Sequence, residues 1–591
     1  MDIKYEWNLK DIYEDEGLID RDVQKLESSL NEIEAFKGTL GESSENIASA
    51  LRKLLEIIEL EERLYGYAML KYHKDMSNGD SIKLYKKIES LATNVSAKTS
   101  FIDPELSKVD TDILLKFLEE NEFLKIEFNK FIKDIIKEKE HILSEELEST
   151  LARFAEIFGA FENTYELFTN TEFDFPEIYV DGEKKQITHG TYSLFMKHPN
   201  REVRKQAFES MYSLYKRHQN SITELYISRV KKSTITANLR KYNSSLDMAC
   251  KGDDSTVDVY NTLLSEVNKN LDLNHRFINL KKKMLGLDEM HLYDMYVNTL
   301  EEESKKVEFE DGRQIVLDAL SPLGEKYIQK LRFIFDNRWL DVYETPNKRS
   351  GGYSMSVYGV HPYILLNYMD TMRDVSTVAH ELGHTMHSVF ANENQNVINA
   401  NYTIMVAEVA STVNEILLAN YLINKEDDEL KKAALINEQL DTIRATLYRQ
   451  SMFAEFEKIV HEKVEAGESL SSENLDEIYY ELNEKYHGKG VVCDEEIKYE
   501  WARIPHFYSC FYVYKYATGI TSAIVIAKNI LEQGEEYVNR YIEMLSKGGS
   551  IGSLDLLKMV DVDLEKPETY EKAFDYFRSN LEELEKIVNN R

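Results

Sequence analysis

The chain contains 591 residues with a formal net charge of −33, and its acidic residues are spread along the sequence rather than collected in a tail. An electrostatic field of this sign repels nucleic acid and anionic lipid, so we expect neither as a partner. With only 8 prolines and 24 glycines, and with many Glu, Lys and Leu residues at helical spacing, the composition predicts a predominantly α-helical protein.

The N-terminus and the cysteines bear on where the protein works. The first residues contain no apolar signal core, and we find no apolar run long enough to span a bilayer. Cys250, Cys493 and Cys510 are far apart and odd in number, so they predict neither a disulfide framework nor a zinc ribbon. We therefore expect a cytoplasmic protein with no membrane partner.

The length predicts more than one lobe, because it exceeds that of a usual single core. Asp181 and Gly182 mark a turn within a short strand pattern, which predicts a small β-hairpin near residues 178–188. A new helix is expected to start after Pro199. We place the boundary near residue 195, which gives an N-terminal helical lobe (1–195) and a second domain (196–591).

Residues 339–368 are rich in Gly, Ser, Tyr and Val, unlike the helical sequence around them. Residues 361–368 have the pattern of a strand. An exposed strand edge could pair with an extended peptide and serve as a platform for it. Gly351, Gly352 and Gly359 would permit a close approach of the backbone, although ordinary turns explain them nearly as well.

The pentapeptide His-Glu-Leu-Gly-His at residues 380–384 indicates a particular chemistry. On a helix, His380 and His384 lie on one face with β-carbons roughly 6 Å apart. Both imidazoles can then bind one zinc ion at about 2.0–2.1 Å. Glu381 can lean over the open side of the metal and accept a proton from the water that zinc activates. The motif predicts a zinc metallopeptidase.

The residues around the pentapeptide favour this interpretation over a solvated, charged helical turn. Apolar residues recur at helical spacing through the segment, which predicts a mostly buried helix of about four turns. A helix buried on most sides does not hold two histidines and a glutamate without partners. Asp374 precedes the run and is a candidate N-cap. The apolar positions are Val375, Val378, Ala379, Leu382, Met386 and Val389.

A catalytic zinc usually has three protein ligands, so a third must come from elsewhere. His387 follows His384 by three residues, but three ligands on one straight helix give poor tetrahedral geometry. We therefore expect His387 to be a packing residue or to form a hydrogen bond that orients a ligand. Glu408 lies in the apolar helical run 403–415 and would be strongly desolvated without a metal or a cation. Glu415, on the same face, could orient a ligand histidine. A buried salt bridge is the alternative for Glu408.

A tyrosine-rich segment covers residues 504–519. Peptide hydrolysis builds negative charge on the former carbonyl oxygen, and neutral hydrogen-bond donors aimed at that oxygen accelerate it strongly. His506, Tyr508, Tyr512 and Tyr514 are the candidate donors. Aromatic stripes on helices are more often core, however, and the chain has 37 tyrosines.

Taken together, these motifs resemble the oligoendopeptidase F branch of the thimet oligopeptidase family of zinc metallopeptidases. The likeness covers nearly the whole chain. It includes the stretch around the pentapeptide, the Val-Ala-Glu-Val-Ala-Ser-Thr run at 406–412, the segments 340–354 and 504–519, and the opening residues 7–13.

The resemblance implies one zinc ion held by His380, His384 and Glu408, with Glu381 as general base. It favours His506 and Tyr514 as donors to the transition state and leaves Tyr508 and Tyr512 as alternatives. It also implies two packed helical lobes around a deep channel, with a small β-sheet beside the zinc helix. Such a channel would admit short, unfolded oligopeptides and exclude folded proteins. The acidic surface adds a secondary hypothesis, a preference for basic peptides.

Two rival functions remain open. A helical zinc carboxypeptidase or dipeptidyl carboxypeptidase needs a cation that grips the C-terminal carboxylate of the substrate, and Arg503 or Lys515 could supply one. A non-catalytic, acidic peptide-binding scaffold would keep two histidines and a glutamate for no chemical reason, so we disfavour it.

Overall fold

The structure is a computed structural model that describes residues 2–297 and 306–590, and within these ranges it is predominantly helical with two small sheets. The predicted fold class is confirmed. The chain forms two compact units, each assembled from three segments. Unit 1 comprises Met1–Glu140, Ser304–Leu422 and Ala523–Asp563, and unit 2 comprises His141–Glu303, Ile423–Ser522 and Leu564–Arg591.

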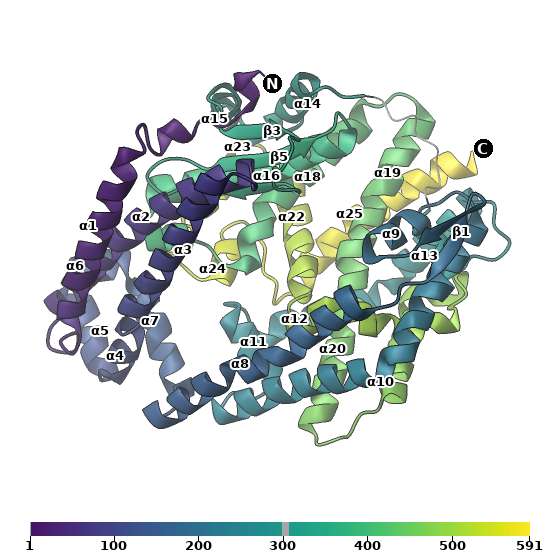
Figure 1. The fold of residues 1–591 in the computed structure, drawn as a ribbon. Helices are drawn as coiled ribbons and strands as arrows, with labels where there is room; N and C mark the ends of the chain where they lie inside the picture. The colour runs from purple at the N-terminus through teal and green to yellow at the C-terminus, as the bar shows by residue number, and fades with distance from the viewer. Residues whose placement is uncertain (1, 298–305, 591) are drawn as a thin grey trace. The chain divides into compact units, whose positions relative to one another are not determined.

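Unit 1 contains the sheet and the motif helices (Figure 1). Its N-terminal helices are α1 (Gly17–Ile33), α2 (Ser44–Lys74), α3 (Gly79–Thr99), α4 (Ile102–Lys108), α5 (Thr111–Glu120), α6 (Glu122–Glu127) and α7 (Asn129–Glu138). Its other elements are α14 (Phe309–Ala319), α15 (Glu325–Asp336), β3 (Leu340–Tyr343), β4 (Tyr353–Met355), β5 (Tyr363–Tyr368), α16 (Met372–Asn394), α17 (Val397–Ala400), α18 (Ile404–Lys425), α23 (Glu535–Ser546) and α24 (Ser553–Lys558).

One hydrophobic core joins the N-terminal helices of unit 1 to its sheet. The buried side chains of α1 to α7 pack with Val357, Tyr363 and Leu365 of the sheet region. Helix α2 comes so close that a Cβ on Gly66 would lie 2.7 Å from Val357 Cγ2. The two compact units therefore do not divide near residue 195. The predicted start of a catalytic domain at that position stays a prediction.

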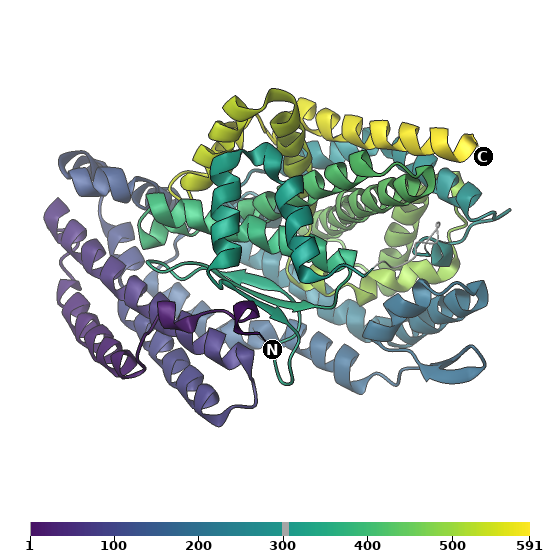
Figure 2. The ribbon, with the colours of Figure 1, turned by 90° about the horizontal axis from the view of Figure 1, so that it is seen from above.

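The sheet of unit 1 has the strand order β3-β5-β4. β5 pairs in parallel with β3, where Leu340 faces Ile364, and in antiparallel with β4, where Ser354 faces the same Ile364. Figure 2 shows the strands side by side with the purple N-terminal segment near them, and the Asn8 N–H donates to the Arg338 carbonyl just before β3 at 2.9 Å. The predicted strand at 361–368 is confirmed as β5.

Within its described residues, unit 2 is helical apart from one hairpin and an isolated β-bridge between His291 and Val492. Its helices are α8 (Glu145–Leu167), α9 (His189–Met196), α10 (Arg201–Leu239), α11 (Ser245–Gly252), α12 (Val257–Lys269), α13 (Leu271–Met284), α19 (Glu429–Ile443), α20 (Arg449–Glu465), α21 (Ser472–His487) and α25 (Pro567–Asn589). Helix α22 (Tyr514–Gln533) begins in unit 2 and ends in unit 1. Strands β1 (Glu177–Val180) and β2 (Glu183–Gln186) pair in antiparallel around Asp181 and Gly182, as predicted.

The expectation that no apolar run is long enough to span a bilayer was wrong. Helix α18 is long and apolar enough, by length and composition alone, to cross a bilayer, with a mean hydropathy of 1.2 over an 18-residue window. Just over half of that window, 56%, is buried inside the protein. Its buried residues include Val406, Ala410 and Val413, which is typical of a core helix as well.

Candidate metal centre and active site

Helix α16 carries the pentapeptide, and its start is fixed by a capping box. The Thr371 side chain accepts a hydrogen bond from the Asp374 N–H, and the Asp374 carboxylate accepts one from the Thr371 N–H. Asp374 is thus the third residue of the helix and not the N-cap, which corrects the prediction. All six apolar positions predicted from the helical spacing are buried, so the predicted buried helix is confirmed, although it runs for 23 residues.

Gly383, inside the pentapeptide, lets α18 pack directly on α16. A Cβ at this position would lie 2.4 Å from Ser411 Cα and 2.6 Å from the Ala410 carbonyl oxygen, closer than real Cβ contacts. The Asn414 side chain donates to the Ala379 carbonyl at 2.9 Å and joins the two helices again. This close crossing brings Glu408 of α18 to the histidines of α16.

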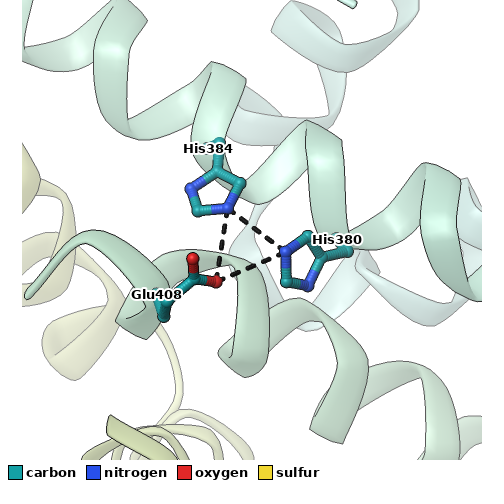
Figure 3. Close-up of side chains that lie close together, drawn as sticks. All are labelled: His380, His384 and Glu408. Atoms are coloured by element: carbon teal, nitrogen blue, oxygen red, sulfur yellow. Dashed lines mark hydrogen bonds and ion pairs between the residues drawn. The ribbon is translucent and has the colours of Figure 1, made fainter. Parts of the chain in front are cut away.

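The three predicted ligands meet at one point (Figure 3). The Nε2 atoms of His380 and His384 are 3.2 Å apart, and Glu408 Oε2 lies 3.4 Å from each. A tetrahedral zinc ion with bonds of about 2.0–2.1 Å has edges of about 3.3 Å between neighbouring ligand atoms. The donor triangle therefore fits one face of a zinc tetrahedron and leaves the fourth corner for water or substrate.

The electrostatics of the triangle favour a positive charge between the ligands. Burial lowers the pKa of His380, but the nearby carboxylates of Glu408 and Glu415 outweigh it and raise the pKa to about 10. The two imidazoles in turn hold the pKa of Glu408 well below its usual range. Ser411 Oγ lies 3.2 Å from Glu408 Oε2 and donates to it, which fixes the carboxylate further.

The exposure of Glu408 differs from what the sequence suggested. Its side chain is 45% exposed, because its apolar neighbours on α18 face the core while the carboxylate faces the open side. The expectation of a strongly desolvated acid was therefore wrong. The distances to His380 and His384, and not burial, make Glu408 a candidate ligand.

The two predicted supporting residues have different surroundings. Glu415 Oε1 lies 3.2 Å from His380 Nδ1, at ion-pair distance although not at an ideal hydrogen-bond angle, so it can orient that ring. His387 is buried and stacks on Tyr402 with the ring centroids 3.6 Å apart. Burial lowers the pKa of His387 to about 3, so it is a neutral packing residue.

Glu381 lies beside the triangle, under the sheet. Its residue exposure is 7%, and burial raises its pKa, a rise that His380, His384 and the backbone N–H of Ser354 limit. A Cβ on Gly352 would lie 3.2 Å from Thr377 Cγ2, and at the ordinary contact distance of 3.6 Å from Glu381 Oε1. The backbone at Gly352 therefore borders the Glu381 carboxylate.

The strand that borders Glu381 is β4, and this corrects the predicted platform. β5 pairs on both sides, with β3 and β4, so it has no edge for a peptide. β4 is at the edge of the sheet, and Ser354 on it contacts Thr385 of α16 at 2.8 Å between the hydroxyl oxygens. Because Thr385 Oγ1 already donates to the Glu381 carbonyl, Ser354 is the donor in that contact.

The tyrosine-rich segment belongs to unit 2, and two of its predicted donors are buried there. Tyr514 is fully buried, and its hydroxyl donates to Asp253 Oδ2 at 3.3 Å. Tyr508 is 2% exposed and its ring stacks on Tyr165. Neither hydroxyl faces solvent, so the preference for Tyr514 as a donor does not fit the structure.

His506 and Tyr512 are the accessible members of the segment. His506 is exposed and Tyr512 is half-buried, with ring centroids 6.2 Å apart. Tyr516, which sequence reasoning missed, is also half-buried, and its hydroxyl lies 3.5 Å from His506 Nε2. Tyr512 precedes α22 whereas Tyr516 lies within it, so no helical spacing links the two. The signal that could have found Tyr516 was its place in the run of tyrosines at positions 512, 514 and 516.

Comparisons with known proteins show the family to which the chain belongs. The family model for peptidase family M3 matches residues 194–576, and the model for Oligopeptidase F matches residues 105–175. Oligopeptidase PepF of Bacillus subtilis is 39% identical over 98% of this chain and 87% of its own length. The plasmid-encoded oligoendopeptidase F of Lactococcus lactis subsp. cremoris is 36% identical over 99% of this chain and 97% of its own.

Solved structures of peptidases resemble this chain over nearly its whole length. The oligoendopeptidase F of Enterococcus faecium superimposes with a TM-score of 0.74 at 32% identity, covering 97% of this chain and 99% of that one. A peptidase crystal structure from Chlamydophila abortus gives a TM-score of 0.93 at 31% identity, covering 99% of both chains. The chain belongs to peptidase family M3, in its oligoendopeptidase F branch.

Proposed function

We propose that this protein is a zinc-dependent endopeptidase that hydrolyses internal bonds of short, unfolded peptides. The observation that carries the proposal is the triangle of His380 Nε2, His384 Nε2 and Glu408 Oε2, with sides of 3.2, 3.4 and 3.4 Å. Membership of peptidase family M3 and the names of the oligopeptidase relatives support the reaction and the peptide substrate.

When bound, zinc supplies Lewis-acid polarisation of the scissile carbonyl and acidifies the attacking water. Glu381 accepts the proton of that water and delivers it to the leaving amine. Its burial suits this role, because a raised pKa brings the carboxylate closer to the basicity that proton transfer near neutral pH requires. Glu415 holds the His380 ring in the orientation that points Nε2 at the metal.

Donors to the developing oxyanion come from the tyrosine-rich segment in this proposal. We assign the role to His506 and Tyr512, with Tyr516 as a further candidate, because these side chains are accessible. The buried Tyr508 and Tyr514 hold the segment in place. The deep channel between helical lobes, which would exclude folded proteins, stays a prediction.

The carboxypeptidase alternative has less support. Lys515 pairs with Asp253 at 2.6 Å, and its side chain is 9% exposed. Arg503 lies over the Tyr192 ring, 4.4 Å from its centroid. Both cations that could grip a substrate carboxylate are therefore engaged inside unit 2. The cytoplasmic location likewise stays a prediction, supported by three cysteines that are all free thiols.

The test is cleavage of an internally quenched peptide of about eight residues by the wild type and by Glu381→Gln, with bound zinc measured in both. We expect internal cleavage by the wild type only and equal zinc in both proteins. Mass spectrometry of the products, for peptides with free and amidated C-termini, separates the two peptidase modes. Cleavage that requires a free C-terminus would overturn the endopeptidase assignment, and turnover by Glu381→Gln within tenfold of wild type would overturn the base.

A further inference from the structure

A polar cavity of about 220 Å³ lies in unit 1 next to the metal helix. Ser388 of α16, one turn after His384, lines it together with Tyr402, the residue on which His387 stacks. Ser354 of β4 and Ser356, just after the strand, also line it. A single water needs only about 10–15 Å³ of such space, so the cavity is large enough for a side chain.

Strand β4 connects this cavity to Glu381. The backbone N–H of Ser354 is close enough to the Glu381 carboxylate to affect its pKa, and the Ser354 side chain lines the cavity. β4 is an edge strand, so its free side can pair with an extended peptide. Because side chains alternate along such a peptide, one close to the scissile bond would point towards the cavity.

Glu62 of α2 is the one charged side chain among the described residues that line the cavity. Its carboxylate accepts a hydrogen bond from the Tyr358 N–H at 3.3 Å and one from the Asn401 side chain at 3.4 Å. Both bonds are long and neutral, and the neighbouring Arg63 lies instead 4.0 Å from Asp22. Within the described residues we find no cation at ion-pair distance from Glu62.

The position of Glu62 is fixed by packing. One turn later on α2, a Cβ on Gly66 would lie 2.7 Å from Val357 Cγ2, so the helix packs closely against the segment that follows β4. The carboxylate is half-buried, and burial raises its pKa. A half-buried carboxylate without a cation favours the approach of one, because a positive group would replace part of the hydration that the carboxylate has lost.

We propose that this cavity is a subsite for a basic side chain of the peptide substrate, with Glu62 as its counter-ion. The inference rests on the proposed function and adds a substrate class to it. The lining fits a lysine or arginine, since serine and tyrosine hydroxyls and asparagine amides can accept or share hydrogen bonds with its nitrogens. An acidic side chain would meet Glu62, and an apolar one would leave these polar groups unpaired.

The experiment measures kcat/KM at about pH 8 for a set of internally quenched peptides in which each position near the scissile bond is in turn Lys, Gln or Glu. We expect one position at which Lys is preferred over Gln by about tenfold, since a charge-assisted hydrogen bond in a half-buried site is worth that much. Glu62→Gln should abolish the preference at that position and leave the cleavage of all-neutral peptides unchanged. Glu62→Lys should invert it in favour of Glu.

The matched control is Glu59→Gln, which removes a half-buried acid one turn earlier on α2 that does not line the cavity. It should keep the preference for Lys. If the wild type cleaves the neutral peptides but Glu62→Gln leaves every positional preference unchanged, the subsite is refuted while the proposed function stands. If no peptide is cleaved, the proposed function fails, and binding then tests the subsite. The affinities of labelled Lys and Gln peptides are measured for Glu381→Gln and for the double variant that also carries Glu62→Gln. If Glu381→Gln binds the Lys and Gln peptides equally well, the subsite is refuted.

Discussion

The metal centre and the tyrosine-rich segment are built in opposite ways. The candidate metal ligands project from two regular helices, α16 and α18, that touch at Gly383 and are tied by a buried hydrogen bond from Asn414. The segment from Pro505 to Tyr514 contains a short 3-10 helix and a turn in which Phe511 has a φ of +59°. Regular helices fix side-chain directions by spacing, whereas an irregular segment fixes them by individual buried contacts.

The strongest test of the helix-built side is Glu408→Ala. Without the third donor, we expect zinc affinity to fall more than 100-fold and activity to disappear at equimolar zinc, because a catalytic site with two ligands does not retain the ion. Zinc content after dialysis and peptide turnover measure both effects. Ser411→Ala, which removes only the hydrogen bond to Glu408, is the control and should keep its metal. Retention of stoichiometric zinc by Glu408→Ala would show that the ion binds elsewhere.

On the irregular side, Tyr512→Phe and Tyr514→Phe form a matched pair, since each removes one hydroxyl. We expect kcat to fall about 100- to 1,000-fold for the accessible Tyr512 with little change in KM, the effect of losing one donor to an oxyanion. For Tyr514, whose hydroxyl contacts Asp253, we expect a loss of thermal stability and a change in kcat of only a few-fold. The reverse ranking would return Tyr514 to the active site.

This contrast explains how much the sequence could predict. The spacing of His380 and His384 on a helix places both on one face, so the sequence could predict this pair and could propose Glu381, beside it, as the base. Glu408 was identified, but with the wrong physical reason, because spacing along α18 does not reveal which side of the helix faces solvent. In the segment 504–519, no periodicity separates the buried Tyr514 from the half-buried Tyr512. The turn at Phe511, which has a positive φ, directly precedes both residues and breaks any regular spacing.

A milder change on the helix side is Glu415→Gln. The amide can still contact His380 but carries no charge, so the imidazole becomes a weaker ligand. We expect zinc affinity to fall about 10- to 100-fold, as for other partners of metal-binding histidines. Competition with a metal chelator, followed by zinc titration of the apoprotein, gives the affinity. His387→Gln is a useful comparison, since that side chain packs on Tyr402 and should alter stability more than zinc binding.

The crossing of the two helices is tested by Gly383→Ala. An added methyl would meet the backbone of Ser411 at 2.4 Å, and forcing the helices apart should cost about 1–3 kcal/mol and separate Glu408 from the histidines. Gly519→Ala is the matched control, because that helical glycine has nothing within 4 Å of an added Cβ. Alanine there should leave stability the same or slightly higher. Thermal unfolding with and without zinc compares the two variants, and equal stability would remove close packing at Gly383 as the cause.

The smallest effect concerns the buried contact that holds the irregular segment. Glu457 of α20 is fully buried, and its Oε1 accepts the N–H of Phe511 at 2.9 Å. Burial raises the pKa of Glu457 to about 8, whereas an unfolded glutamate titrates near its ordinary value of 4.5. Between these values the folded protein binds the proton and the unfolded chain does not. Its contribution to stability is therefore complete below about pH 4.5 and is lost as the pH rises through about 8.

Glu457→Gln removes this titration and keeps a side-chain oxygen for the Phe511 N–H. As the pH rises from about 5 to about 9, the melting temperature of the variant minus that of the wild type should therefore increase by a few degrees. Peptide turnover near neutral pH should stay the same. Glu462→Gln, on the same helix but with a side chain 62% exposed, should follow the wild type at every pH. A constant offset between Glu457→Gln and wild type would mean that the carboxyl does not titrate in this range. The hydrogen bond from the Phe511 N–H to Glu457 would then hold the positive-φ turn without a pH-dependent contribution, beside Arg229, which donates to the Tyr508 carbonyl at 2.7 Å.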